Sequence, residues 1–261
     1  SAASVVYKRQ LPYYSKGDFM ELKNLKVAHR GLFDNKKIPE NSLLAFRRAI
    51  SFCIPFELDV QLTKDNVIIV FHDMNLKRMC GVDKYISDMT YDEIRKLSLL
   101  STKEKIPTFR EVLELTNGSV LLDIEIKKTN RVEFVCDKIL DDLKNYQGDI
   151  LLKSFQPNVV RYLKKRSSYS VGLLITEYPP SKLYSYLISS SFLVKYCHPD
   201  FLAINKNIIK KKRLQYYRKK MPLFVWTILS QRELDIFSDY ADSFLCNNLP
   251  LSLIHISEPT R

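Results

Sequence analysis

The sequence has little glycine and no long hydrophobic run. Among its 261 residues there are 6 glycines and 11 prolines, against 46% hydrophobic residues. This composition excludes collagen-like and disordered chains and leaves enough apolar side chains for a sizeable core. No run approaches the roughly 18 consecutive apolar residues that a membrane-spanning helix needs. We therefore expect a folded globular protein without a membrane span.

Two common kinds of site motif are also absent. The chain has no Gly-x-Gly-x-x-Gly or other glycine-rich phosphate loop, which disfavours a nucleotide-binding fold. Its five cysteines are widely spaced and include no Cys-x-x-Cys pair, so they indicate neither a zinc site nor a disulfide framework. The N-terminus shows no secretion signal. We expect reduced, buried thiols and a cytoplasmic protein.

Positive charge is in excess, with a formal net charge of +12, but it is dispersed along the chain. The densest cluster is residues 206–220, which also contains Tyr216 and Tyr217. Such a cluster can bind RNA or anionic lipid, yet in a lysine-rich chain it is more often a solvated helix face. We adopt the second interpretation, and expect no nucleic-acid partner and at most weak association with anionic membranes. The oligomeric state is left open.

Both ends look foreign to the rest of the chain. Residues 1–10 and 251–261 resemble translated adapter or vector sequence, and neither continues the pattern beside it. The intervening residues 11–250 contain no low-complexity tract and no linker, which favours a single domain.

Short apolar runs alternate with segments of helical periodicity throughout this domain. Eight runs are typical of strands, at 25–28, 55–60, 119–126, 149–153, 170–175, 201–204, 222–228 and 243–246. Seven helices are expected, at 41–52, 108–115, 131–143, 157–165, 180–188, 208–218 and 231–238. Eight strands alternating with helices predict an α/β fold, the (β/α)8 TIM barrel. No eighth helix is visible after residue 250, so we expect a barrel without its last helix.

One region interrupts the alternation. A further short apolar run at 67–71 predicts an additional strand, and a long stretch from Met74 to Pro107 follows it. An excursion from the upper face of a barrel is typical of a loop built for function rather than for closure.

Acidic residues gather where the predicted strands end, which is where the active sites of such barrels lie. Glu57 and Asp59 are two apart on one strand, so both side chains point into the barrel. Glu125 points inward from the neighbouring strand by the same alternation. Three hard oxygen donors on adjacent strands favour Mg²⁺ or Ca²⁺ over zinc. The alternative is that one of them only forms a structural ion pair across the barrel.

Two histidines and two cations lie close to these carboxylates in the predicted fold. His29 and His72 both lie at strand ends, and a pair of histidines can divide the roles of general acid and general base. Arg30 and Lys127 add fixed positive charge for a phosphate group. This combination favours phosphoryl transfer over glycoside or acyl chemistry, which needs less positive charge.

Six motifs occur in order, namely VAHRG at 27–31, PENSLLAF at 39–46, FELDVQLTKDNVIIVFHD at 56–73, LLDIEIK at 121–127, KSFQP at 153–157 and FVWTI at 224–228. Over about residues 25–250 the chain thereby resembles the glycerophosphodiester phosphodiesterase family, in its compact bacterial type. The resemblance implies a barrel that hydrolyses glycerophosphodiesters to glycerol 3-phosphate and an alcohol with the help of one divalent cation.

The resemblance also implies roles by position. The two histidines match the family's acid/base pair, the three carboxylates match its metal ligands, and the two cations match its phosphate-contacting residues. Four more residues match substrate-binding positions: Glu40 and Asn41 after the first strand, and Phe155 and Trp226, which face the glycerol. Two departures from the pattern lie away from the chemistry, because Cys53 and Asn66 stand where the family often has glycine.

Glycerol itself favours one mechanism. The hydroxyl next to the ester carbon lies within reach of phosphorus, so it can attack internally and form a cyclic phosphate that water then opens. One histidine would remove the proton and the other would protonate the leaving alcohol.

Two other functions compete with this interpretation. The first is a phospholipase D-like lyase acting on sphingomyelin or lysophospholipid, a related barrel that usually has Asp where this chain has Glu125. The second is a noncatalytic barrel that binds phosphorylated ligands or nucleic acid through its basic surface. Loss of a metal ligand or a histidine would favour the second, and none is lost.

Overall fold

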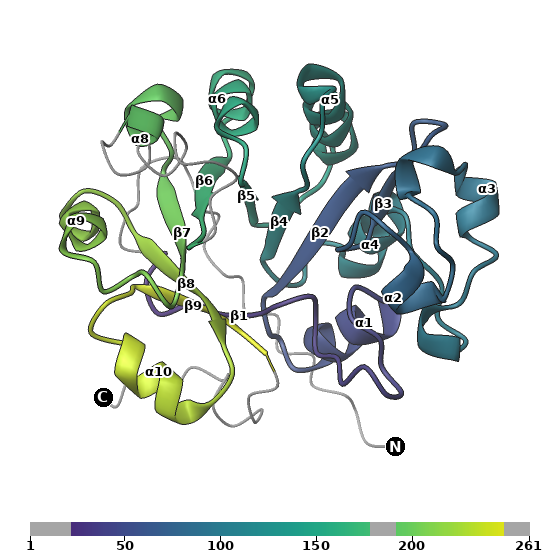
Figure 1. The fold of residues 1–261 in the computed structure, drawn as a ribbon, viewed down its shortest axis with the longest axis horizontal. Helices are drawn as coiled ribbons and strands as arrows, with labels where there is room; N and C mark the ends of the chain where they lie inside the picture. The colour runs from purple at the N-terminus through teal and green to yellow at the C-terminus, as the bar shows by residue number, and fades with distance from the viewer. Residues whose placement is uncertain (1–21, 178–191, 248–261) are drawn as a thin grey trace, which may run out of the picture.

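A computed structural model describes residues 22–177 and 192–247. Within these residues, eight parallel strands close into a barrel (Figure 1). They are β1 (Lys26–Ala28), β2 (Phe56–Leu62), β4 (Leu122–Ile126), β5 (Ile150–Ser154), β6 (Ser170–Ile175), β7 (Phe201–Asn205), β8 (Leu223–Ile228) and β9 (Ser243–Cys246). Strand β1 pairs with both β9 and β2, which closes the ring. The predicted (β/α)8 barrel is therefore confirmed.

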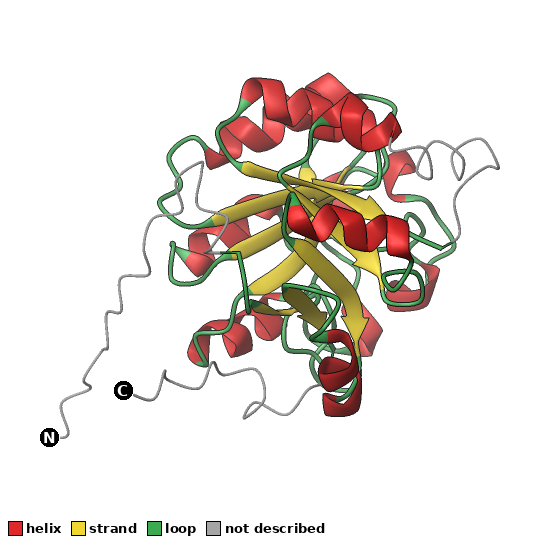
Figure 2. Ribbon diagram, turned by 90° about the vertical axis from the view of Figure 1, so that its left-hand side faces the viewer, coloured by secondary structure: helices red, strands yellow, loops and turns green. Residues whose placement is uncertain are grey.

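Helices surround the strands on the outside of the barrel (Figure 2). They are α1 (Leu43–Ser51), α4 (Phe109–Thr116), α5 (Val132–Leu143), α6 (Pro157–Arg166), α8 (Phe192–Cys197), α9 (Lys212–Gln215) and α10 (Gln231–Phe237). The helix expected at 208–218 is shorter than predicted, since α9 passes into a 3-10 turn, η3 (Tyr216–Lys219). The helix expected at 180–188, the absent last helix and the two foreign-looking ends all fall outside the described residues.

Local signals fix where several helices begin. The Ser42 hydroxyl accepts a hydrogen bond from the backbone N–H of Ala45 and caps α1. Thr108 and Glu111 form a reciprocal capping box at α4, and Pro157 occupies the first turn of α6. The two caps satisfy N–H groups that the first helical turn leaves without a partner, and proline at the start of α6 has no N–H to satisfy.

The strands are buried on both faces, as the near-continuous apolar runs predict. Alternate residues pack outward against the helices in a large cluster that includes Leu58, Ile124 and Leu152. A smaller cluster includes Val27 and Phe201, which take the other position in the alternation and so fill part of the barrel interior. The rest of the interior is polar, and the candidate site lies there.

The excursion after β2 is a folded unit rather than a loop. Strand β3 (Ile68–Val70) runs antiparallel to β2, as the extra run predicted. Four short helices follow that the sequence did not reveal: α2 (Lys77–Cys80), η1 (Ile86–Asp88), α3 (Tyr91–Ile94) and η2 (Leu99–Ser101). Their apolar residues form a separate small core around Phe71, Leu76 and Met79. This unit lies beside β2 and α4, at the edge of the barrel (Figure 1).

The cysteines agree only in part with expectation. Cys136, Cys197 and Cys246 are free and buried, as predicted. Cys53 is exposed and Cys80 is half-buried, so the prediction of buried thiols was wrong for these two. Cys53 occupies a turn between α1 and β2, where its backbone has a positive φ of 53°.

Candidate active site

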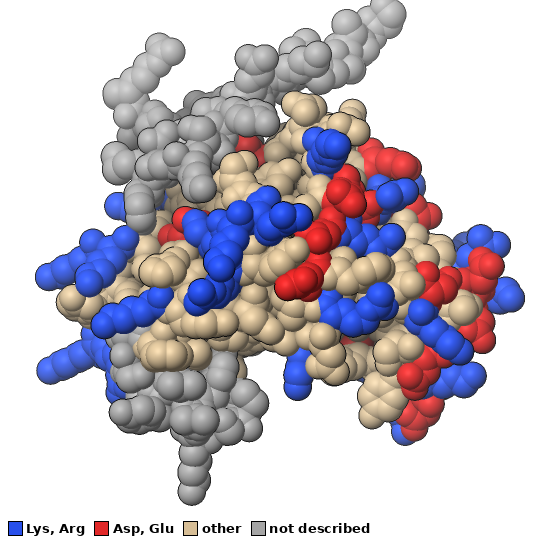
Figure 3. Space-filling model, turned by 90° about the horizontal axis from the view of Figure 1, so that it is seen from above, with Lys and Arg blue, Asp and Glu red and all other residues tan. Residues whose placement is uncertain are grey.

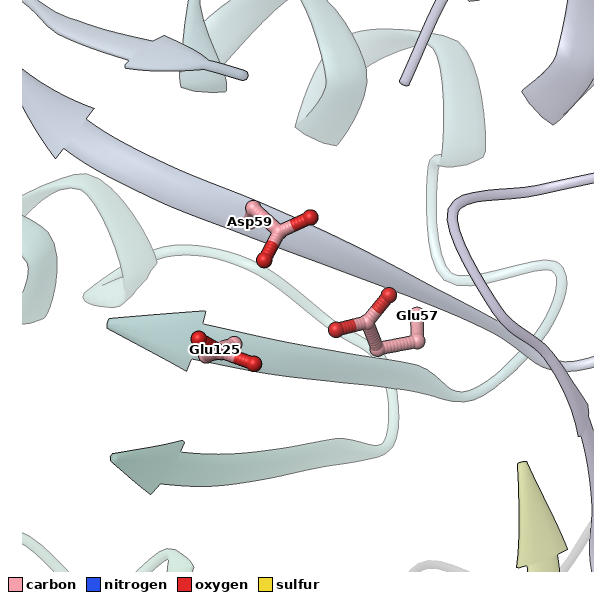
Figure 4. A group of neighbouring side chains, drawn as sticks. All are labelled: Glu57, Asp59 and Glu125. Atoms are coloured by element: carbon pink, nitrogen blue, oxygen red, sulfur yellow. The ribbon is translucent and has the colours of Figure 1, made fainter. Parts of the chain in front are cut away.

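Three carboxylates converge inside the barrel near the C-terminal ends of the strands. Glu57 and Asp59 project from β2, and Glu125 projects from β4, where it is the register partner of Asp59 (Figure 4). One oxygen from each residue lies within 4.8 Å of the others, and all three side chains are buried. The alternation of inward and outward residues along parallel strands produces this convergence.

The cluster has the character of a cation site. Burial and the negative charge of Asp59 raise the pKa of Glu57 well above its usual value. The Oε1 atom of Glu57 is buried and accepts no hydrogen bond. An oxygen-only set of donors, one oxygen of which accepts no hydrogen bond, fits a hard divalent cation such as Mg²⁺ or Ca²⁺.

Two lysines supply part of the opposing charge. The Lys127 ammonium donates to Asp59 Oδ1 at 3.1 Å and to Glu125 Oε1 at 2.7 Å. The Lys153 ammonium is completely buried, donates to Asp123 Oδ2 at 2.6 Å and lies 3.6 Å from Glu57 Oε1. Although burial disfavours a charged ammonium, Asp123 and Glu57 raise the pKa of Lys153 above its usual value. Four carboxylates and two ammonium groups therefore lie together on β2, β4 and β5 and at the residue that follows β4.

His29 and Arg30 follow β1 directly. The Nε2 atom of His29 is 4.0 Å from Glu57 Oε2, and its Nδ1 donates to Asn247 Oδ1 at 2.9 Å. Burial and the neighbouring Arg30 lower the pKa of His29 to about 3. Arg30 has a positive φ of 59°, and its backbone N–H donates to Glu57 Oε2 at 3.0 Å. The turn after β1 thus wraps around Glu57.

Glu40 and Asn41 hold this turn and the cluster together. The Asn41 side-chain amide donates to Asp59 Oδ2 at 2.8 Å. Glu40 accepts from Arg30 at 2.8 Å and from two nitrogens of Arg78, at 2.6 and 3.1 Å. Although burial opposes its ionisation, hydrogen bonds from Arg78 and the charge of Arg30 lower the pKa of Glu40 to about 2. Glu40 and Asn41 thus make their hydrogen bonds to side chains of the site.

His72 reaches the site from the excursion. Its Nδ1 donates to Asp73 Oδ1 at 2.7 Å, and its side chain is one-third exposed. Arg78 on α2 donates to both oxygens of Asp73, at 2.6 and 3.0 Å. Because Arg78 also holds Glu40, one guanidinium connects the loop that carries His72 with the loop that follows His29.

Phe155 and Trp226 lie on the other side of the barrel mouth. Their ring centroids are 5.7 Å apart with the planes nearly perpendicular, and both pack on the apolar interior cluster. The Trp226 indole N–H donates to the Ala203 carbonyl at 3.0 Å. The two rings form an apolar wall after β5 and on β8, opposite the β1–β2 side that carries the histidines.

Comparison with known proteins places this geometry in a family. The sequence profile of the glycerophosphoryl diester phosphodiesterase family matches residues 29–245. The chain belongs to the glycerophosphoryl diester phosphodiesterase family. A glycerophosphodiester phosphodiesterase of Caldanaerobacter subterraneus is 30% identical over 227 residues, which cover 82% of this chain and 89% of the relative. The resemblance found in the sequence motifs is therefore confirmed.

Solved structures agree with this assignment. The glycerophosphodiester phosphodiesterase of Thermotoga maritima has a TM-score of 0.69 at 28% identity, covering 85% of this chain and 93% of that one. A phosphodiesterase of Oleispira antarctica, solved with the product sn-glycerol-3-phosphate, shares the fold with a TM-score of 0.73 at 19% identity, covering 87% and 94%. No helix within residues 22–177 or 192–247 has the length and apolar character that a membrane span requires.

Sequence reasoning missed four residues of the site in this family member: Asp73, Arg78, Asp123 and Lys153. A signal existed for two of them, since Asp123 and Lys153 have the same inward position in their strands as Glu125. Their ion pair was not visible, because it joins residues 30 positions apart. Arg78 lies on a helix of four residues, which is too short to show periodicity.

Proposed function

We propose that this chain hydrolyses glycerophosphodiesters to glycerol 3-phosphate and an alcohol, and that one divalent cation held by Glu57, Asp59 and Glu125 is required. The observation that carries the proposal is the convergence of these three buried carboxylates with two histidines and two cations at the mouth of a barrel of this family. The activity of the Caldanaerobacter relative supports the reaction.

The cation-binding part of the proposal is supported by the donor set. Glu57 has a buried oxygen without a hydrogen bond, and the carboxylates are closer to one another than unscreened negative charges favour. When bound, Mg²⁺ or Ca²⁺ would neutralise this charge and stabilise negative charge on the phosphate oxygens.

Arg30 and Lys127 are suited to hold the phosphate group. The Arg30 Nε atom is buried without a hydrogen bond and lies 3.6 Å from Asp59 Oδ2. The Lys127 ammonium has three N–H donors and gives two of them to Asp59 and Glu125. A phosphate oxygen at the mouth would accept the remaining donors.

The histidines are oriented for proton transfer. His29 donates its Nδ1–H to Asn247 and His72 donates its Nδ1–H to Asp73, which leaves Nε2 of each ring for the reaction. In the proposed sequence, one histidine takes the proton of the glycerol 2-hydroxyl as its oxygen bonds to phosphorus. The other protonates the leaving alcohol as its P–O bond breaks. Water then opens the cyclic phosphate with the two roles reversed.

The remaining expectations fit the same proposal. The rings of Phe155 and Trp226 would offer an apolar surface to the glycerol carbons. We also propose a cytoplasmic location for the enzyme, which its five free cysteines support.

The decisive experiment is hydrolysis of glycerophosphocholine, with glycerol 3-phosphate measured by a coupled assay and phosphorus products followed by ³¹P NMR. We expect release of glycerol 3-phosphate, its loss on chelation and its recovery when Mg²⁺ or Ca²⁺ is returned. Full activity in chelator would refute the cation requirement. A cyclic phosphate that accumulates as the final product would instead indicate a lyase, and no turnover of any glycerophosphodiester would refute the proposed reaction.

A further inference from the structure

A groove opens beside the carboxylate cluster, between the β2–β3 hairpin and the segment that follows β4. Its volume is about 460 Å³. Lys127 lines the groove and also contacts Asp59 and Glu125, so the groove and the cluster share a wall. Met74, two residues after His72, lines it from the hairpin side. The groove is therefore continuous with the place where phosphate chemistry is proposed.

The groove is strongly basic. Four of its lining residues are cationic, namely Lys64, Lys127, Lys128 and Arg131, and among the lining residues that the structure describes there is no carboxylate. Within residues 22–177 and 192–247, neither Lys64 nor Lys128 forms an ion pair within 4.0 Å, although the charge of Lys64 also acts on Glu93. Arg131 is held in place by the Asn66 side chain and by the Phe134 ring, whose centroid is 4.0 Å from the guanidinium carbon. Positive charge in the groove is thus available to a ligand.

The groove and the apolar wall of Phe155 and Trp226 lie on different sides of the barrel mouth. The apolar wall of Phe155 and Trp226 comes from the β5 and β8 side, whereas the groove lies beyond β2 and β4. If the wall contacts the glycerol, the other substituent of phosphorus points away from it. Ser87 and Asn130 add a hydroxyl and an amide to the lining, which suits a hydroxylated group.

We propose that this groove receives the leaving group of the phosphodiester, and that its cations select a leaving group that carries negative charge, such as a phosphorylated polyol. The inference rests on the proposed function and names its substrate class. A cationic leaving group such as choline meets the charges of Lys64, Lys128 and Arg131, while Lys127 is already paired with carboxylates, so choline is disfavoured. An uncharged polyol is intermediate.

The test compares three diesters that share the glycerophosphoryl group: glycerophosphocholine, glycerophosphoinositol and a phosphorylated glycerophosphoinositol. We expect kcat/KM to be highest for the phosphorylated substrate and lowest for the choline ester. The double variant Lys64→Gln/Lys128→Gln should lower the ratio of kcat/KM between the phosphorylated and the uncharged inositol substrates about fivefold to tenfold, since exposed ion pairs contribute up to ~1 kcal/mol each.

A matched control separates the groove from net charge. Lys144→Gln/Lys165→Gln removes two exposed lysines at the C-terminal ends of α5 and α6, at the opposite end of the barrel, and should leave the ratio unchanged. A preference for glycerophosphocholine, or an equal effect of both double variants, would overturn the inference while the proposed function stands. If none of the three is hydrolysed, the proposed function fails, and calorimetry with free inositol phosphate decides the groove: no binding, or binding that the Lys64/Lys128 variant retains, overturns it.

Discussion

The two halves of the barrel interior differ in kind. On the β2, β4 and β5 side, five of the inward side chains are charged: Glu57, Asp59, Asp123, Glu125 and Lys153. On the β6 to β9 side they are mostly apolar, and include Leu174, Phe201, Phe224 and Leu245. Apolar burial stabilises the fold without partners, whereas each buried charge needs an opposite charge or a ligand. The candidate site lies in the charged half, and the apolar half contributes burial without needing a ligand.

The register shows how closely the halves meet. Asp59 pairs with Glu125, Glu125 with Lys153, Lys153 with Gly172, and Gly172 with Phe201. One row of residues thus passes from carboxylates to an ammonium, then to a glycine beside an aromatic ring. Gly172 separates the charged half from the apolar half, because its lack of a side chain leaves room for the Phe201 ring.

The surface differs between the two sides in the sign of its charge. Seen from above, Lys and Arg predominate on the side of α8 and α9, while acidic and basic side chains are mixed on the side of the excursion (Figure 3). The mixed charges include the exposed pair of Lys77 with Asp83. Dispersed exposed pairs contribute little to stability, so the internal halves are the informative comparison.

The largest expected effect comes from removing the two histidines that are proposed to transfer protons. His29→Ala and His72→Ala should each lower kcat by about 10²–10⁴, because general acid or base catalysis is worth that much. Far-UV circular dichroism should show an intact fold. The matched control is His198→Ala, which removes an exposed histidine in the loop before β7, at the opposite end of the barrel. Turnover by either site variant within about tenfold of wild type would reject the pair.

The candidate site also shows which residues can be predicted from sequence and which cannot. Strand alternation is a local period, so it correctly placed Glu57, Asp59 and Glu125 on inward faces near the strand ends. Arg78 could not be found in this way, because its contact with Glu40 joins residues 38 apart and depends on how the excursion folds back. The excursion was predicted as a loop because its helices have only three or four residues.

The second prediction concerns the buried ion pair of Lys153 with Asp123 in the charged half. Lys153→Met should lower the free energy of unfolding by about 3–5 kcal/mol, because it leaves Asp123 buried without its partner. Urea unfolding followed by the fluorescence of Trp226, the single tryptophan, measures this. The double variant Lys153→Met/Asp123→Leu should regain most of the loss, since an apolar pair is tolerated at such a site. A double variant as unstable as the single one would contradict the ion-pair explanation.

The third prediction tests the apolar half at its boundary. In Gly172→Ala the added Cβ would lie 2.3 Å from Phe201 Cε2, in a region with no exposed surface. We expect a loss of about 1–3 kcal/mol in unfolding free energy from overpacking. Adding Phe201→Leu should restore part of it, because the smaller side chain can move away. If Gly172→Ala is as stable as wild type, the two halves are less tightly packed at this point than the structure indicates.

The smallest effect concerns the turns at the two ends of β2, the strand that carries Glu57 and Asp59. Cys53 before it and Asn66 after it have positive φ values of 53° and 66°, a backbone conformation that favours glycine. A residue with a Cβ pays about 1 kcal/mol in this region, and Asn tolerates it better than Cys.

Cys53→Gly should therefore raise the unfolding free energy by about 0.5 kcal/mol, after part of the gain is lost to the greater freedom of glycine in the unfolded chain. Asn66→Gly should change it less. Urea unfolding of both variants provides the measurement, and Cys53→Ser is the control, because it removes the exposed thiol but keeps the Cβ. If Cys53→Ser stabilises the protein as much as Cys53→Gly, the thiol rather than the backbone conformation is responsible, and the turn before the charged half carries no strain.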